Sequence, residues 1–238
     1  MHMKDVVDRV RQAVSIAASV RGTKPLNVWI TEHSRRLVVN KENKQMAKTY
    51  TTNLQAALST ADFFTAMAQI PEVKSTCLQA LNGVGRQIFD ASVRYGDLRP
   101  RPVYWAKRVL NYGRQGAVLS TSTKSPSTSG YPGGYDVSAV ALANGTDRIT
   151  VWVVNRASTS MDSEILYLPL KGQVVEMQHY YLAGKSGIDA DEVGDDYQLD
   201  IQPAWKQAEF SDNGVLFVRL PPSSVSTFVV RRKGRGSD

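Results

Sequence analysis

Glu32 is the first residue of the chain whose setting suggests chemistry, because it follows an apolar stretch directly. Residues 26–31 alternate Leu, Val and Ile with other side chains and are rich in β-branched and aromatic types, which predicts a buried strand. Glu32 then stands at its carboxyl end, the edge where α/β proteins bind ligands and barrel enzymes place catalytic groups. The sequence therefore offers Glu32 as a catalytic carboxylate, and the alternative is a carboxylate that caps the strand in solvent.

Gln79 has a similar setting in a second buried strand, which is predicted over residues 74–82. If the sheet is wound sequentially, the two strands are neighbours, and Glu32 and Gln79 face one pocket. A carboxylate beside an amide suits a polyhydroxylated ligand, with Glu32 as nucleophile or base and Gln79 hydrogen-bonded to hydroxyl groups. The alternative is that Gln79 satisfies nearby backbone groups.

His33 and Ser34 follow Glu32 and raise the question of a catalytic triad. Neighbouring side chains on a strand point in opposite directions, so these residues cannot meet as a base and a nucleophile do. We therefore set the triad aside.

No metal or cofactor site is expected from the remaining residue types. One cysteine, Cys77, and three histidines are too few for a His/Cys cage, and the apolar flank of Cys77 predicts a buried small hydrophobe. The acidic run within residues 189–196 lacks the spacing of a calcium loop and is interpreted as a solvated loop between strands.

The composition excludes several classes of protein. The formal charge is +7, but the basic residues are scattered, so neither a nucleic-acid groove nor nucleic-acid binding is predicted. No apolar stretch reaches the roughly 18 residues that a membrane span requires, and no signal-peptide run is present. The helical pattern begins within the first residues without a cap, so we expect the natural start to lie upstream. Both a cytoplasmic and a secreted location therefore remain alternatives.

The first 115 residues alternate between helix and strand patterns. Helical stripes are predicted over residues 4–21, 51–69 and 102–114, and they flank the two predicted strands. This order of elements is typical of a parallel α/β sheet or barrel.

Beyond residue 115 the pattern becomes that of an all-β domain over residues 116–238. Residues 120–134, rich in Ser, Thr, Gly and Pro, form a boundary or surface loop, and Asn144-Gly145 predicts a hairpin. Period-2 runs predict an antiparallel sandwich or jelly roll, with strands at residues 136–143, 148–155, 164–170, 174–182, 197–201, 214–220 and 224–230.

The order of these parts resembles the C-terminal half of glycoside hydrolase family 51, the retaining α-L-arabinofuranosidases. The resemblance is carried by Thr-Glu-His at residues 31–33, the helix at residues 53–64, Leu-Gln-Ala-Leu-Asn at residues 78–82, and the closing Leu-Pro-Pro-Ser-Ser-Val at residues 220–225. It implies the last part of a (β/α)8 barrel over residues 1–115, followed by a jelly roll.

The resemblance also implies roles for individual residues. Glu32 is similar to the nucleophile on the seventh barrel strand, Gln79 to a sugar-contacting glutamine on the eighth, and Asn82 to a structural asparagine nearby. His33, which stands where many members have Trp or Tyr, is expected to contact substrate. Residues 103–110 resemble the last barrel helix. The implied reaction is a double displacement on an arabinose-containing oligo- or polysaccharide, and members often form homo-oligomers.

The chain lacks one part that this reaction requires. The family's acid/base glutamate belongs to an Asn-Glu pair, and this sequence contains no such pair. Retaining hydrolysis needs two carboxyl groups roughly 5 Å apart, so we expect the isolated chain to be inactive.

Two alternatives remain open. A non-catalytic carbohydrate-binding or structural sandwich would expose aromatic side chains such as Trp152, Tyr180 and Tyr181 on one sheet face, whereas in the first interpretation these side chains fill the core. Another barrel glycosidase with a different sugar would keep Glu32 as nucleophile.

Overall fold

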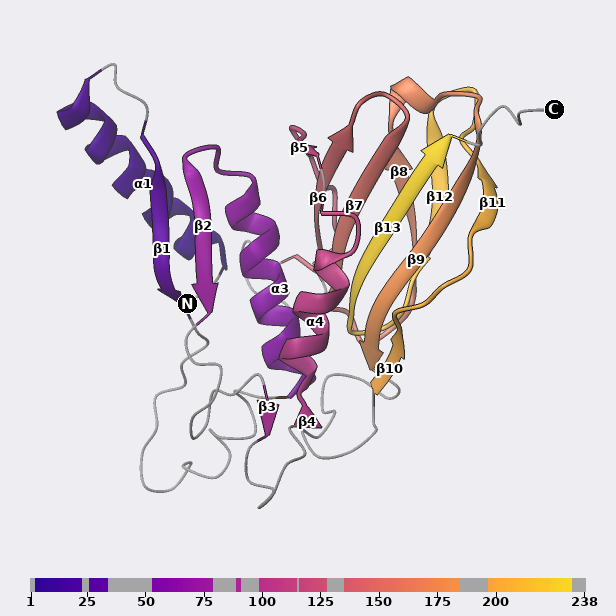
Figure 1. The fold of residues 1–238 in the computed structure, drawn as a ribbon, viewed down its shortest axis with the longest axis horizontal. Coiled ribbons are helices and arrows are strands. Elements are labelled where there is room, and N and C mark those ends of the chain that lie inside the picture. The colour runs from indigo at the N-terminus through magenta and orange to yellow at the C-terminus, as the bar shows by residue number, and fades with distance from the viewer. Residues whose placement is uncertain are drawn as a thin grey trace.

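The computed structural model describes residues 3–22, 26–33, 53–78, 89–90, 99–114, 116–127, 135–184 and 197–232. Figure 1 shows a parallel strand pair and its first helix at one end, and a large antiparallel sheet at the other. Helices α3 (Leu54–Ala68) and α4 (Pro102–Asn111) lie between them. Helix α3 contacts both β2 and the large sheet, and α4 contacts α3 and the large sheet. The predicted combination of α/β and antiparallel parts is confirmed.

All three predicted helices are present. Helix α1 (Met3–Arg21) and helix α3 match their predicted ranges closely, and α3 begins where the Asn53 side chain accepts a hydrogen bond from the Ala56 N–H at 3.1 Å. Helix α4 starts with Pro102 in its first turn, a position that proline tolerates because its missing N–H has no helical partner there. The helix boundaries therefore follow local capping chemistry.

Helix α4 ends three residues earlier than its apolar pattern predicts, because Gly113 turns the chain sharply. Gly113 has φ +68°, and a Cβ atom there would lie 2.7 Å from both Thr150 Oγ1 and Val229 Cγ2. Only glycine allows this conformation and this close approach to the sheet.

The strand pair consists of β1 (Val28–His33) and β2 (Val73–Leu78), which are parallel. Glu32 lies within β1 as its second-to-last residue, so the strand continues one residue beyond the predicted catalytic carboxylate. The second predicted strand is confirmed over its first part, and residues 79–82 lie outside the described residues.

The large sheet contains seven strands in the order β10-β9-β13-β7-β6-β5, with β11 also paired to β9. A separate antiparallel pair, β8 and β12, packs on one face of it, and two short strands, β3 and β4, pair with each other. The bounds are β3 Phe89–Asp90, β4 Arg99–Pro100, β5 Ala117–Val118, β6 Val137–Asn144, β7 Arg148–Asn155, β8 Met161–Leu166, β9 Val174–Gly184, β10 Tyr197–Asp200, β11 Lys206–Glu209, β12 Val215–Leu220 and β13 Ser224–Arg232.

One predicted strand in this region needs correction, and β5 and β11 were not predicted. The run at residues 164–170 is not one strand, because β8 ends at Leu166 and residues Leu168–Leu170 form a 3-10 turn around Pro169, which lacks an N–H for a ladder. Strand β11 was not predicted, because Lys-Gln-Ala-Glu carries no apolar alternation.

The centre of the large sheet is buried on both faces, which explains the composition of its central strands. In β7, Ile149, Val151 and Val153 face the β8–β12 pair, whereas Trp152 and Val154 face α3 and α4. Every residue of β7 after Arg148 is buried. Helices α3 and α4 therefore form a layer that packs on one face of the sheet. A single apolar cluster joins residues before and after position 115.

Candidate active site

The candidate active site lies at the carboxyl ends of β1 and β2. The two strands are hydrogen-bonded neighbours in parallel register, with Val28 opposite Val73 and His33 opposite Leu78. Because both strands run the same way, the backbone of Glu32 lies at the same edge of the sheet as the backbone of Leu78. The prediction that these two strands are adjacent is confirmed.

The predicted roles of the individual site residues stay predictions. Ser34, Gln79 and Asn82 lie outside the described residues, and for Glu32 and His33 the structure describes the backbone alone.

An apolar cluster fixes the strand pair against α1 and α3. Val28 and Ile30 of β1 and Val73 of β2 pack with Val14 of α1 and with α3 residues, of which Met67 is 1% exposed. Apolar residues at alternate positions of β1 thus turn one face of the strand toward the helices. This packing sets the position of the edge that carries Glu32.

The other face of β1 is open. Trp29 is 70% exposed, and Thr31 is exposed on the same side. Parallel sheets are normally covered on both faces, so an exposed tryptophan here marks a face without a covering layer in the described part of the chain.

Cys77 is exposed, so the prediction of a buried small hydrophobe is wrong. Among the described side chains of β2, the apolar cluster under the strand pair includes Val73, near the start of the strand. Cys77 lies four residues farther along, beyond this packing.

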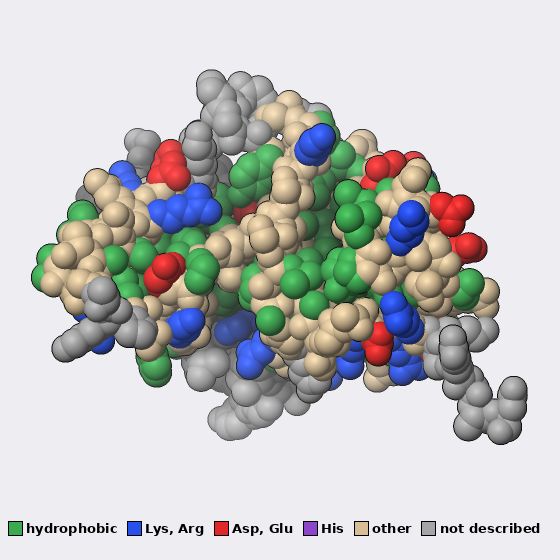
Figure 2. Space-filling view, turned by 90° about the horizontal axis from the view of Figure 1, so that it is seen from above, with side chains coloured by type: hydrophobic (Ala, Val, Ile, Leu, Met, Phe, Trp, Pro, Cys, Tyr) green, Lys and Arg blue, Asp and Glu red, His purple; other side chains and the backbone are tan. Residues whose placement is uncertain are grey.

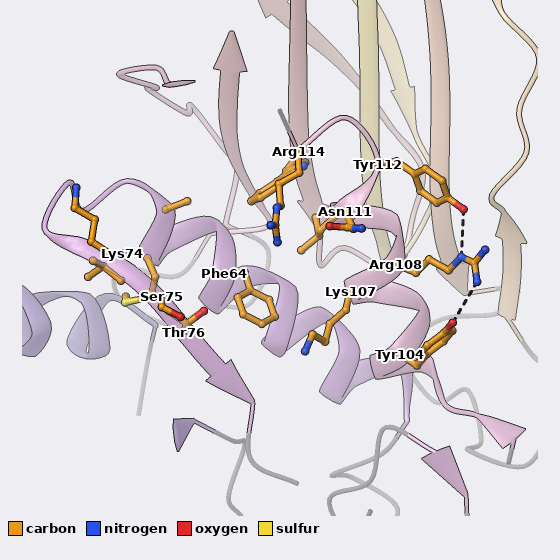
Figure 3. A pocket seen from close by; sticks show the side chains of 15 residues that line it. Phe64, Lys74, Ser75, Thr76, Tyr104, Lys107, Arg108, Asn111, Tyr112 and Arg114 are labelled. Carbon is orange, nitrogen blue, oxygen red and sulfur yellow. Dashed lines mark hydrogen bonds between the residues drawn. The ribbon is translucent and has the colours of Figure 1, made fainter. Parts of the chain in front are cut away.

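A groove of about 1070 Å³ runs along β2 on the side away from β1. Figure 3 shows β2 and α4 as its two walls, with Phe64 of α3 between them. Lys107 of α4 points toward Phe64, whereas Arg108 points away from β2 toward Tyr104 and Tyr112, and Lys74 lies on β2. Sequence reasoning missed this groove because its walls, β2 and α4, come from separate segments of the chain.

Arg108 is held by two tyrosines one helical turn away on either side. Its Nη1 donates to the Tyr104 hydroxyl and its Nε donates to the Tyr112 hydroxyl, both at 3.2 Å (Figure 3). These bonds raise the pKa of Arg108. Lys107 Nζ lies 5.8 Å from the centre of the Phe64 ring, and partial burial lowers the pKa of Lys107.

Asp62 forms a buried polar centre between α3 and the large sheet that the sequence reasoning also missed. It is 1% exposed and accepts hydrogen bonds from the hydroxyl of Tyr135 at 2.9 Å and of Ser138 at 2.6 Å, while Arg156 Nη1 lies 3.4 Å away. Burial raises the pKa of Asp62 against the opposing effects of these three partners. Asp62 is the single charged residue of α3, a signal that was available in the sequence.

We expect Asp62→Ala to lower the free energy of unfolding by about 2–4 kcal/mol, because it leaves buried hydroxyls without an acceptor and Arg156 without its carboxylate. Urea denaturation of the two proteins measures this change. Asp8→Ala, on the exposed face of α1, is the matched control and is expected to change stability by less than about 0.5 kcal/mol. Equal effects of the two substitutions would contradict the structural role of Asp62.

The three aromatic residues that would favour a carbohydrate-binding sandwich are not aligned on an open face. Trp152 is 7% exposed and belongs to the core against α3 and α4. Tyr180 and Tyr181 are half-buried, and the Tyr180 ring stacks on Tyr112 with centroids 4.2 Å apart. For Trp152 and Tyr180, these contacts agree with the interpretation that the aromatic side chains fill the core.

Within the described ranges there is no group of three or more His, Cys, Asp or Glu residues placed to hold a metal ion. The acidic run within residues 189–196 lies outside them. No helix among the described elements has the length and hydropathy to cross a membrane. Lys and Arg side chains are dispersed over the face seen in Figure 2.

Neither a protein-family profile nor a curated protein sequence matches the chain. Its fold is that of glycoside hydrolases of known structure. The GH51 α-L-arabinofuranosidase from Thermotoga petrophila RKU-1 superposes with TM-score 0.70 at 14% identity, and the α-L-arabinofuranosidase from Thermotoga maritima with TM-score 0.68 at 17% identity. Each match covers 96% of this chain and 48% of the other chain.

A GH30 subfamily 8 xylanase from Clostridium acetobutylicum is less similar, with TM-score 0.54 at 13% identity over 86% of this chain and 42% of its own. The chain therefore has the fold of a C-terminal portion of a GH51 arabinofuranosidase and spans about half the length of those enzymes.

Proposed function

We propose that this chain is the C-terminal part of a retaining glycoside hydrolase that releases terminal α-L-arabinofuranosyl residues. The observation that carries the proposal is the parallel pairing of β1 and β2, which brings the carboxyl end of the strand that contains Glu32 next to the carboxyl end of the strand whose last residue is Leu78. The resemblance in fold to GH51 arabinofuranosidases supports the choice of sugar.

In this proposal Glu32 is the nucleophile. Its carboxylate attacks the anomeric carbon, the bond to the leaving oxygen breaks, and a glycosyl-enzyme ester forms that water later hydrolyses. Gln79 hydrogen-bonds sugar hydroxyls, and His33 contacts substrate beside the nucleophile. The acid that protonates the leaving oxygen and then activates water comes from a polypeptide segment outside this sequence.

The proposal extends to the architecture. Residues 1–115 form the end of a (β/α)8 barrel, and residues 116–238 form a jelly roll. The parallel strand pair with its flanking helices supports the first part, and the two facing antiparallel sheets support the second.

The isolated chain is expected to hydrolyse 4-nitrophenyl α-L-arabinofuranoside no faster than buffer, because retaining hydrolysis requires a second carboxyl group roughly 5 Å from the nucleophile. Release of nitrophenolate by the 238-residue chain measures this. Turnover that disappears in Glu32→Gln would show that the chain contains its own acid/base residue.

A second candidate is a barrel glycosidase that acts on xylan, favoured by the fold similarity to the GH30 xylanase. It retains Glu32 as nucleophile and changes the sugar. Arabinofuranosidase activity is preferred because the GH51 structures superpose over more of the chain and with higher TM-scores.

A further inference from the structure

A row of polar side chains crosses the large sheet at the end where β6 and β13 finish (Figure 1). Its members are cross-strand partners on neighbouring strands, so their side chains share one face of the sheet. Farther along the strands, the same face carries Trp152 and packs against α3 and α4. The row consists of Gln207 of β11, Glu176 of β9, Arg231 of β13, Arg148 of β7 and Asn144 of β6.

The helix layer ends before it reaches this row. Gly113, which follows α4, lies against Thr150 and Val229. These two residues are the neighbours of Arg148 and Arg231 on the same face, because side chains alternate along a strand. The side chain of Arg231 is 47% exposed, and Arg148 is half-buried. Both arginines are therefore accessible to a ligand in the described part of the chain.

Two contacts fix the orientation of Arg231. Its Nε donates to Glu176 Oε2 at 2.8 Å, and its guanidinium carbon lies 3.9 Å from the centre of the Trp205 ring. The bond to Glu176 leaves both Nη groups of Arg231 without a hydrogen-bond partner among the described residues. A guanidinium held in this way presents a planar set of donors, which matches the geometry of a carboxylate.

Arg148 places a second positive charge directly opposite Arg231. Like charges at directly opposite positions of a sheet repel each other, and no described carboxylate forms an ion pair with Arg148. Arg232, on the other face of β13, is by contrast paired with Asp147 at 3.4 Å. An anion between Arg148 and Arg231 would offset the repulsion and give Arg148 a partner.

Neutral polar groups lie beside the two arginines. The Tyr180 hydroxyl donates to Gln178 Oε1 at 2.8 Å, and Gln178 Nε2 donates to the Pro203 carbonyl at 2.9 Å. Burial raises the pKa of Tyr180, and the charge of Arg148 opposes this rise, so the hydroxyl lies within electrostatic reach of Arg148. Its oxygen can still accept a hydrogen bond. A ligand that carries hydroxyl groups beside a carboxylate therefore suits this part of the sheet.

We propose that the row binds the carboxylate of an acidic sugar, a hexuronate. The carboxylate accepts hydrogen bonds from Arg148 and from the Nη groups of Arg231, a sugar hydroxyl donates to Tyr180, and Trp205 borders the sugar ring. Glu176 repels a ligand that is negatively charged along its whole length, so a nucleic-acid backbone fits less well. The proposal concerns the all-β part of the chain and does not depend on the role of Glu32.

Titration of the full 238-residue chain with two methyl glycosides tests the proposal. Methyl β-D-glucuronide carries one carboxylate, and methyl β-D-glucoside has a hydroxymethyl group in its place. The glucuronide is expected to shift the NMR signal of the Trp205 indole N–H and to bind about tenfold more tightly than the glucoside, with an affinity that falls as salt is added. Equal binding of the two glycosides would overturn the proposal. Binding of acetate or orthophosphate as tightly as the glucuronide would overturn the choice of a sugar.

Arg148→Gln is expected to weaken glucuronide binding about tenfold, because it removes charge-assisted hydrogen bonds. The substitution breaks no ion pair among the described residues, so the variant is expected to fold, and an unchanged midpoint of thermal unfolding checks this. Arg232→Gln, on the opposite face of the sheet, is the matched control and is expected to keep the affinity, although it loses the contact with Asp147. Equal losses in the two variants would contradict the proposal, because binding would then respond to overall charge and not to this row.

Discussion

Glu32→Gln is expected to lower arabinofuranosidase activity by about 10⁴-fold in a fusion enzyme that supplies the rest of the catalytic domain. The fusion joins the part of the Thermotoga maritima arabinofuranosidase that this chain does not match to residues 1–238. Glutamine has nearly the shape of glutamate, but its amide does not form the glycosyl ester. The loss should appear in kcat with 4-nitrophenyl α-L-arabinofuranoside as the substrate.

Glu72→Gln is the matched control for this experiment. Glu72 directly precedes β2, so it lies at the opposite end of the strand pair from Glu32, and its backbone carbonyl accepts the Val28 N–H at 2.7 Å. The control is expected to keep the activity of the parent fusion. Activity that survives Glu32→Gln, or that falls equally in both variants, would remove Glu32 from the nucleophile role. Hydrolysis of an aryl xyloside in preference to the arabinofuranoside would favour the second candidate.

Much of the fold could be predicted because its elements carry local signals. Asn144-Gly145 predicted the β6–β7 hairpin, and Gly145 has φ +68°, a conformation that this turn requires and glycine adopts readily. Strand β11 was not predicted because its conformation is set by backbone pairing with β9 and not by a pattern of its own side chains. Its polar residues pair along Val174–Met177 through the backbone, and backbone pairing leaves no mark in the sequence pattern.

The burial of the large sheet on both faces was harder to predict. The apolar run of β7 predicts a strand, as do the other runs of this region. Its near-continuous hydrophobicity, however, is typical of a strand that is covered on both faces. Its cover on one face comes from α3 and α4, which lie far away in the sequence. The burial of this face of β7 is therefore decided by its tertiary contact with α3 and α4.

For the candidate site, the sequence predicted only the edge of the sheet at which it lies. The strands of Glu32 and Gln79 were identified from local apolar patterns, and their adjacency follows from sequential winding, which the structure bears out. The Asp62 centre could not be assembled from the sequence, because Tyr135, Ser138 and Arg156 lie 73, 76 and 94 residues from it along the chain. A single aspartate in an apolar helix indicates that it has a partner in the protein interior, but the sequence pattern does not identify that partner.

His179 gives the second large effect, a loss of stability as the pH falls. Its ring is stacked on Phe228, a residue of the apolar cluster between the sheets, with centroids 4.2 Å apart, and its Nε2 lies 2.9 Å from Ser226 Oγ. Burial, and to a lesser degree the charge of Lys206, lowers the pKa of His179 from 6.5 to about 4. The folded protein therefore keeps a neutral imidazole at a pH where the unfolded chain binds a proton.

This difference fixes the direction of the pH dependence. The contribution of His179 is fully present above pH 6.5 and is lost as the pH falls toward 4, because the unfolded state binds more protons in that window. The loss approaches about 3 kcal/mol. Urea denaturation at several pH values, with His179→Gln as the comparison, separates this loss from that of the carboxyl groups, which titrate in both proteins. Parallel stability curves for the two proteins would show that His179 is solvated enough to protonate in place, and that the contact between the sheets is looser than its stacking on Phe228 indicates.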